Sequence, residues 1–157
     1  MSTDVMKKTV ALIDDDDGPI RYYEVALKDA GFDIVRIKDF KEALDFIMKP
    51  KPFPDFWIID VMMPIRDENL MIDGIEAVKL TSLGLGAGLV LYQKLKKEAP
   101  NAPALMLTSI TTPSLLNHIE QSLMQGDKCE AKLDTLPSDL VKIVSSCIHR
   151  NEQGHNQ

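Results

Sequence analysis

The stretch that decides the fold runs from residue 9 to residue 17 and reads Thr-Val-Ala-Leu-Ile-Asp-Asp-Asp-Asp. Its apolar part is continuous rather than alternating with polar residues, which is typical of a parallel strand that is covered on both faces. Four carboxylates follow without a break, so the predicted strand ends where an acidic loop begins. This end of the predicted sheet is therefore the place to look for further polar groups.

The rest of the chain alternates short apolar runs with amphipathic stretches. Further strands are expected at residues 32–37, 55–60, 104–108 and, more weakly, 128–133. Helices are expected over residues 18–31, 40–47, 89–95, 113–125 and 137–149. Five strands that alternate with helices predict an α/β fold, in which a doubly wound, five-stranded parallel sheet carries helices on both faces.

The length suits one domain with a sizeable core. We expect a single domain over residues 1–157, with a core over about 8–149 and a polar, frayed tail over 151–157. The segment between the third strand and the next helix is longer than an ordinary loop, so we expect an insertion there, over about 67–87.

Charge and cysteine content narrow the class of protein. The chain has 24 acidic and 18 basic side chains, which argues against a nucleic-acid partner because such partners require a basic surface. Its two cysteines, Cys129 and Cys147, are too few for a disulfide framework and fit a reducing compartment. The sequence shows no secretory signal and no transmembrane stretch, so we expect a cytoplasmic protein with no membrane partner.

Polar residues stand at the carboxyl ends of the predicted strands, where ligands bind in folds of this kind. They are Asp14, Asp15, Asp60, Thr108 and Lys132. Three neighbouring carboxylates repel one another unless a cation joins them, and such oxygen ligands suit Mg²⁺. A hydroxyl and an ammonium group beside them are able to orient a phosphoryl group, and a carboxylate is able to accept it as an aspartyl phosphate.

Four segments resemble the receiver domain of two-component response regulators. They are residues 10–15, residues 57–64, residues 105–109 and Lys132, in the family's order, each at the close of a predicted strand. The resemblance covers roughly residues 8–149 apart from the insertion. It implies a flavodoxin-like sheet with the strand order 2-1-3-4-5. Because only a short tail follows the last predicted helix, we expect a stand-alone receiver. The resemblance implies that it is not an enzyme beyond taking up and losing its own phosphoryl group.

The resemblance assigns a magnesium site and a phosphoacceptor. Asp60 would be the phosphoacceptor, and Asp14 and Asp15 would be the acidic pair that binds Mg²⁺, with Asp15 the more direct ligand. The backbone carbonyl of Met62 would complete the protein's ligands. Because four aspartates are consecutive, the pair 15–16 is an alternative, but the strand that leads into the run favours Asp14 and Asp15.

The resemblance also implies how the phosphoryl group is held and who supplies it. Thr108 would form a hydrogen bond with the phosphoryl group, and Lys132 would pair with one of its oxygens. The donor would be a sensor histidine kinase or a histidine phosphotransfer protein. Phosphorylation would then alter binding to a downstream protein target, and a homodimer is a further partner that the resemblance allows.

The sequence departs from the family pattern at three places, which concern how phosphorylation would alter the surface that binds partners. Leu133 stands where the family commonly has proline, and Cys129 occupies the position of an aromatic switch residue. The family's Asp-Gly after Met-Pro is replaced by Asp67-Glu68, while a second candidate, Asp73-Gly74, lies within the insertion. These departures allow a different reading, a receiver-like interaction module that no longer accepts phosphate.

Two other motifs suggest phosphate chemistry of other kinds. Asp15-x-Asp17-Gly18 resembles the signature of haloacid-dehalogenase-like phosphatases, with Asp15 as the nucleophile, but Pro19 replaces its threonine and Asp60 is left without a role. The glycine-rich residues 84–88 lack the Gly-Lys-Ser/Thr ending of a phosphate-binding loop. We therefore interpret them as a flexible or helix-breaking segment.

Overall fold

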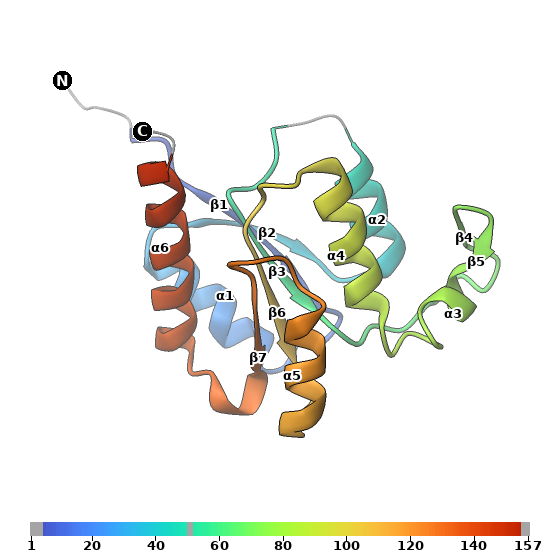
Figure 1. The fold of residues 1–157 in the computed structure, drawn as a ribbon. Coiled ribbons are helices and arrows are strands. Elements are labelled where there is room, and N and C mark those ends of the chain that lie inside the picture. Colours follow the sequence, from blue (N-terminus) through green and yellow to red (C-terminus); the bar gives the residue numbers. More distant parts are fainter. Residues whose placement is uncertain (1–4, 50–51, 155–157) are drawn as a thin grey trace.

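A computed structural model describes residues 5–49 and 52–154 (Figure 1). Five strands form one parallel sheet in the order β2-β1-β3-β6-β7, which confirms the predicted fold class and strand order. The strands are β1 (Thr9–Ile13), β2 (Asp33–Ile37), β3 (Phe56–Asp60), β6 (Ala104–Thr108) and β7 (Lys128–Ala131). Every residue of β3 and β6 is buried, because helices cover both faces of the sheet.

The helices divide into two layers, one on each face of the sheet (Figure 1). One layer consists of α1 (Ile20–Asp29) and α6 (Pro137–Gly154). The other consists of α2 (Phe40–Met48), α4 (Ala87–Glu98) and α5 (Pro113–Gln121). Alternate residues of β1 point to opposite layers: Val10 and Leu12 pack with α1 and α6, and Ala11 and Ile13 with α2 and α4. The continuous apolar run of β1 follows from this double cover.

The predicted ends of two elements are wrong. Residues 128–133 do not form one strand: β7 ends at Ala131, and the chain then makes a short 3₁₀ turn, η1 (Lys132–Asp134). The predicted start of the frayed tail, residue 151, is too early, because α6 continues to Gly154. Residues 155–157 lie outside the described part. An ion pair of 2.9 Å between Lys8 Nζ and Glu152 Oε1 joins this extra turn of α6 to the start of β1.

The insertion forms a small unit of its own beside the main sheet (Figure 1). It contains an antiparallel hairpin of β4 (Met71–Ile72) and β5 (Ile75–Glu76), followed by α3 (Ala77–Leu80). Asp73 and Gly74 form the tip of the hairpin, with φ of 52° and 80°, as a two-residue turn of this kind requires. Asp73-Gly74 is thus a hairpin turn.

Of the helices in the described ranges 5–49 and 52–154, none has both the length and the apolar character that crossing a membrane requires.

Candidate functional site

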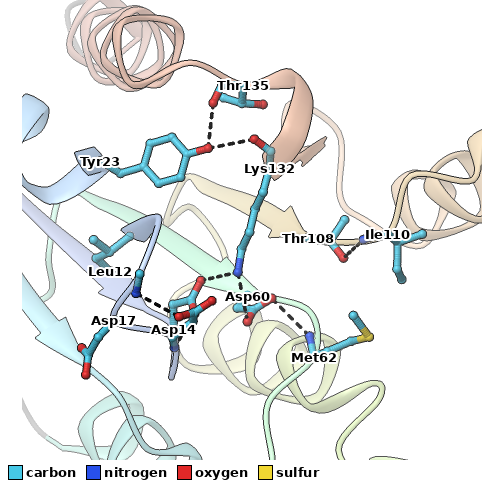
Figure 2. Close-up of polar contacts among 12 residues, drawn as sticks. Leu12, Asp14, Asp17, Tyr23, Asp60, Met62, Thr108, Ile110, Lys132 and Thr135 are labelled. Carbon is cyan, nitrogen blue, oxygen red and sulfur yellow. Dashed lines mark hydrogen bonds and ion pairs between the residues drawn. The ribbon is translucent and has the colours of Figure 1, made fainter. Parts of the chain in front are cut away.

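Three carboxylates meet at the carboxyl ends of β1 and β3, which lie side by side in the sheet. Figure 2 shows two of them, Asp14 and Asp60. Asp14, Asp15 and Asp60 each offer an oxygen, and these oxygens lie within 4.8 Å of one another. Asp14 and Asp60 are buried, and Asp15 is half-buried. Parallel strands place their carboxyl ends at one edge, so residues far apart in the sequence converge as predicted.

Lys132 reaches the same point from the start of η1, beyond the edge strand β7 (Figure 2). Its Nζ lies 2.6 Å from Asp14 Oδ2 and 3.4 Å from Asp60 Oδ2. The Lys132 side chain is only 12% exposed, so its charge is weakly screened by water. One ammonium group therefore bridges two of the three carboxylates.

Electrostatics within the site favour the neutral form of Asp60. Burial raises the pKa of Asp60 to about 7, and the charge of Asp14 adds to this rise. Lys132 and the N–H of Met62, which donates to Asp60 Oδ1 at 3.4 Å, act in the opposite direction. For Lys132, burial disfavours the charged form, but the contacts with Asp14 and Asp60 outweigh it, so the pKa of Lys132 is raised. Lys132 is therefore charged at neutral pH.

Thr108 closes β6 and is buried, next to β3 in the sheet. Its Oγ1 accepts a hydrogen bond of 3.1 Å from the N–H of Ile110, which fixes the turn that leaves the strand (Figure 2). Met62 contacts the site through its N–H, and the predicted use of its carbonyl as a metal ligand stays a prediction. All the side chains that the sequence predicts for the site thus lie at one edge of the sheet.

The four consecutive aspartates divide into two pairs. Asp14 Oδ1 accepts from the N–H of Asp16 at 2.9 Å, and Asp16 Oδ1 accepts from the N–H of Gly18 at 2.9 Å, so two aspartate turns follow one another. Asp17 is turned toward Lys38, with an ion pair of 2.6 Å. The geometry therefore favours Asp14 and Asp15, rather than the pair 15–16, as the acids of the site.

Two further residues shape the site and escaped prediction. Arg36 in β2 donates hydrogen bonds to main-chain carbonyls of the acidic loop. The hydroxyl of Tyr23 in α1 donates to the carbonyl oxygens of Lys132 and Thr135, at 3.0 and 2.7 Å (Figure 2). The charge of Arg36 among the apolar residues Ile34, Val35 and Ile37 was a sequence signal for the first of these two residues. For Tyr23, its position on the apolar face of α1 indicated only the core.

The glycine-rich residues 84–88, at the end of the insertion and the start of α4, are bonded directly to the backbone that follows Asp60. Gly88 donates a hydrogen bond of 2.8 Å to the carbonyl of Val61, and Met63 donates one of 3.1 Å to the carbonyl of Gly84. A Cβ atom on Gly88 would lie 1.9 Å from the carbonyl oxygen of Asp60, so only glycine permits this approach. The glycine-rich segment does break the helix between α3 and α4, as predicted, and it also packs against the site.

Comparison with known proteins relates this fold to solved structures. No protein-family model matches the chain, and no curated protein sequence matches it. A CheY-like response regulator receiver domain from Methanospirillum hungatei JF-1 superposes with a TM-score of 0.66 at 17% identity, covering 94% of this chain and 98% of that one. The receiver domain of the Francisella response regulator 1452 gives a TM-score of 0.66 at 21% identity, covering 92% and 99% of the two chains. The chemotaxis protein CheY4 of Vibrio cholerae gives 0.62 at 21% identity, covering 90% and 98%.

Proposed function

We propose that this chain, which has the receiver-domain fold of response regulators, accepts a phosphoryl group on Asp60 from a phosphohistidine of a partner protein, in a reaction that depends on Mg²⁺. The observation that carries the proposal is the convergence of Asp60 with two further carboxylates and a bridging lysine at the edge of the sheet. Such a group of charges is suited to holding and transferring phosphate rather than to stabilising a fold.

The donor set fits Mg²⁺. Three carboxylates share one ammonium group, so the site keeps an excess of negative charge when the acids are ionised. Carboxylate oxygens are the ligands that Mg²⁺ prefers, and Asp14, Asp15 and Asp60 would hold the ion together with the predicted carbonyl of Met62. When bound, Mg²⁺ supplies positive charge that offsets the charge of the carboxylates and of the incoming phosphoryl group.

The residues of the chain have separate roles in the transfer. A carboxylate oxygen of Asp60 forms a bond to phosphorus while the phosphorus–nitrogen bond of the phosphohistidine breaks, and the imidazole nitrogen keeps that electron pair. Lys132, already 3.4 Å from Asp60 Oδ2, lies close enough to pair with a phosphoryl oxygen. The Thr108 hydroxyl, at the end of the neighbouring strand, would donate to another. The phosphorylated chain would then bind a downstream protein differently.

The geometry disfavours the phosphatase alternative. That mechanism needs both Asp15 and Asp17 at the reacting centre, with Asp15 as the nucleophile. Asp17 instead pairs with Lys38 at 2.6 Å and its side chain is 61% exposed. We therefore expect no turnover of an aryl phosphate by this chain.

Labelling with radioactive acetyl phosphate tests the proposal. We expect the chain to become labelled in the presence of Mg²⁺ and to remain unlabelled when the ion is removed with EDTA. Asp60→Asn should abolish labelling because the nucleophile is lost. The matched control is Asp73→Asn, which changes an exposed aspartate of the hairpin and should leave labelling unchanged. Labelling of the Asp60→Asn protein at the wild-type level would contradict the assignment of Asp60 as the acceptor. A wild-type chain that takes up no label would favour the interaction module that does not accept phosphate.

A further inference from the structure

Arg36 makes an unusual set of contacts for a charged side chain. It stands in β2, opposite Leu12 of β1, and its side chain is only 11% exposed. Its Nη1 donates to the carbonyl oxygens of Asp14, Ile37 at 3.1 Å and Leu12 at 3.5 Å. Its Nη2 donates to the carbonyl oxygen of Asp16 at 3.1 Å. One guanidinium group thus joins the end of β1, the acidic loop and the end of β2.

Carboxylates play a minor part in these contacts. The nearest carboxylate oxygen, Oδ1 of Asp17, is 3.9 Å from Arg36 Nη2, and that side chain is mostly exposed. The hydrogen bonds of Arg36 are to the main chain, and the planar fork of a guanidinium group, unlike an ammonium group, is able to donate in several fixed directions at once. The contacts therefore set the path of the backbone over residues 14–16.

The path of this backbone decides where the carboxylates of Asp14 and Asp15 lie. The carboxylates of Asp14 and Asp15 repel each other, so contacts to the main chain are needed to keep them close together. Besides Arg36, the N–H of Asp14 donates to the carbonyl of Ile37 at 3.0 Å, which joins the same two strand ends. Among the described residues, the hydrogen bond from Arg36 joins β2 to the main chain of Asp16.

We propose that Arg36 is a positioning residue for the divalent cation: it holds the main chain of residues 14–16 so that Asp14 and Asp15 present their carboxylates together. This inference rests on the proposed function, because it assumes that the acidic group binds Mg²⁺. Arg36 itself touches neither the cation nor the phosphoryl group, and it acts through the carbonyl oxygens that it binds.

Positioning and simple charge predict opposite effects of removing Arg36. A cation near a metal site repels the metal ion, so charge alone predicts tighter Mg²⁺ binding to Arg36→Gln. Positioning predicts weaker binding, by about tenfold, as is usual when a residue that orients metal ligands is replaced. Arg36→Lys keeps the charge but cannot reproduce the four hydrogen bonds, so positioning predicts weaker binding for this variant as well.

The experiment is a Mg²⁺ titration followed by the amide chemical shifts of residues 14–18 and 60–63, on the wild type, Arg36→Gln and Arg36→Lys. Lys38→Met is the matched control, because it removes a neighbouring cation that pairs with Asp17 without touching the carbonyl oxygens. We expect Lys38→Met to bind Mg²⁺ at least as tightly as the wild type. Faster hydrogen exchange of the amides of residues 14–18 should accompany the loss in both Arg36 variants.

Urea unfolding without Mg²⁺ shows which variants are folded before the dissociation constants are compared. If Arg36→Gln does not fold, Arg36→Lys carries the test. Arg36 variants that bind Mg²⁺ as tightly as the wild type, or more tightly, overturn the inference and leave the proposed function standing. A wild-type chain that shows no Mg²⁺ binding at residues 14–18 and 60–63 overturns both.

Discussion

At the scale of single residues, ionising Asp60 is costly in the folded chain. Its carboxyl group is buried beside the carboxylate of Asp14, and its pKa rises to about 7. Lys132 and the N–H of Met62 offset only part of that rise. The carboxylate of Asp60 must be ionised to attack phosphorus. Its buried surroundings therefore disfavour the form that the proposed reaction needs.

Stability without Mg²⁺ should therefore depend on pH through Asp60. Between about pH 4, where an unfolded aspartate titrates, and pH 7, the folded state binds more protons than the unfolded state, so the free energy of unfolding falls as pH rises. Asp60→Asn removes this dependence. We expect Asp60→Asn to gain about 2 kcal/mol over the wild type between pH 5 and pH 8. Urea unfolding of both proteins at pH 5 and pH 8 measures this difference in the free energy of unfolding. A difference that becomes smaller toward pH 8 would contradict a raised pKa of Asp60.

Tyr23 offers a test of how Lys132 is held. The single hydrogen of its buried hydroxyl is shared between the carbonyl oxygens of Lys132 and Thr135, so Tyr23→Phe removes the donor that both carbonyls use. We expect a loss of about 1–2 kcal/mol in the free energy of unfolding, measured with urea. Tyr22→Phe, one position away and 70% exposed, is the control and should change stability by less than about 0.5 kcal/mol. Equal effects of the two changes would show that the hydroxyl of Tyr23 is unimportant.

At the scale of elements, the sequence predicted the strands better than the ends of the helices. Each central strand is a continuous apolar run that closes on a polar residue, and both signals are local. The true extent of α6 depends on packing and on the contact of Glu152 with Lys8, which lies at the other end of the chain. The hairpin over residues 71–76 was missed because its strands are two residues long and show no periodicity.

Among the glycines, Gly88 at the junction of α4 with the end of β3 has the least room for a side chain. Gly88→Ala would place a Cβ 1.9 Å from the carbonyl oxygen of Asp60, so the helix or the strand end must move. We expect a loss of about 3 kcal/mol or more in the free energy of unfolding, together with slower labelling by acetyl phosphate. Gly86→Ala, whose Cβ would meet only the carbonyl of Thr81 at 3.6 Å, is the control. A Gly88→Ala protein with wild-type stability would show that this contact is not tight in solution.

At the scale of the whole molecule, the site could be predicted because parallel topology brings strand ends together. Asp14, Asp15, Asp60, Thr108 and Lys132 each close or follow a strand, so their order along the chain was enough. Arg36 and Tyr23 could not be assigned in this way, because they bind main-chain oxygens of distant segments. Those partners depend on strand register and on helix packing, which the pattern of residue types does not specify.

Hydrogen bonds between residues 61–63 and residues 84–88 predict that a structural change at Asp60 reaches the glycine-rich segment. Beryllofluoride with Mg²⁺ imitates a phosphorylated aspartate, and we expect it to shift the amide resonances of residues 61–63 and of 84–88. The hydrogen bonds Gly88 N–H to Val61 and Met63 N–H to Gly84 connect the two segments. The control is Asp60→Asn with the same additions. Shifts confined to residues 105–136 would contradict this coupling.

The small hairpin has a practical consequence. Within the described residues, β4 and β5 pair with each other and not with the five-stranded sheet, and their turn at Asp73-Gly74 is exposed. A peptide tag or a fluorophore placed at that turn would interrupt no ladder of the main sheet. The same insertion is bonded to the backbone beside Asp60. The fluorescence of a dye at the hairpin tip would therefore report changes at the acidic site.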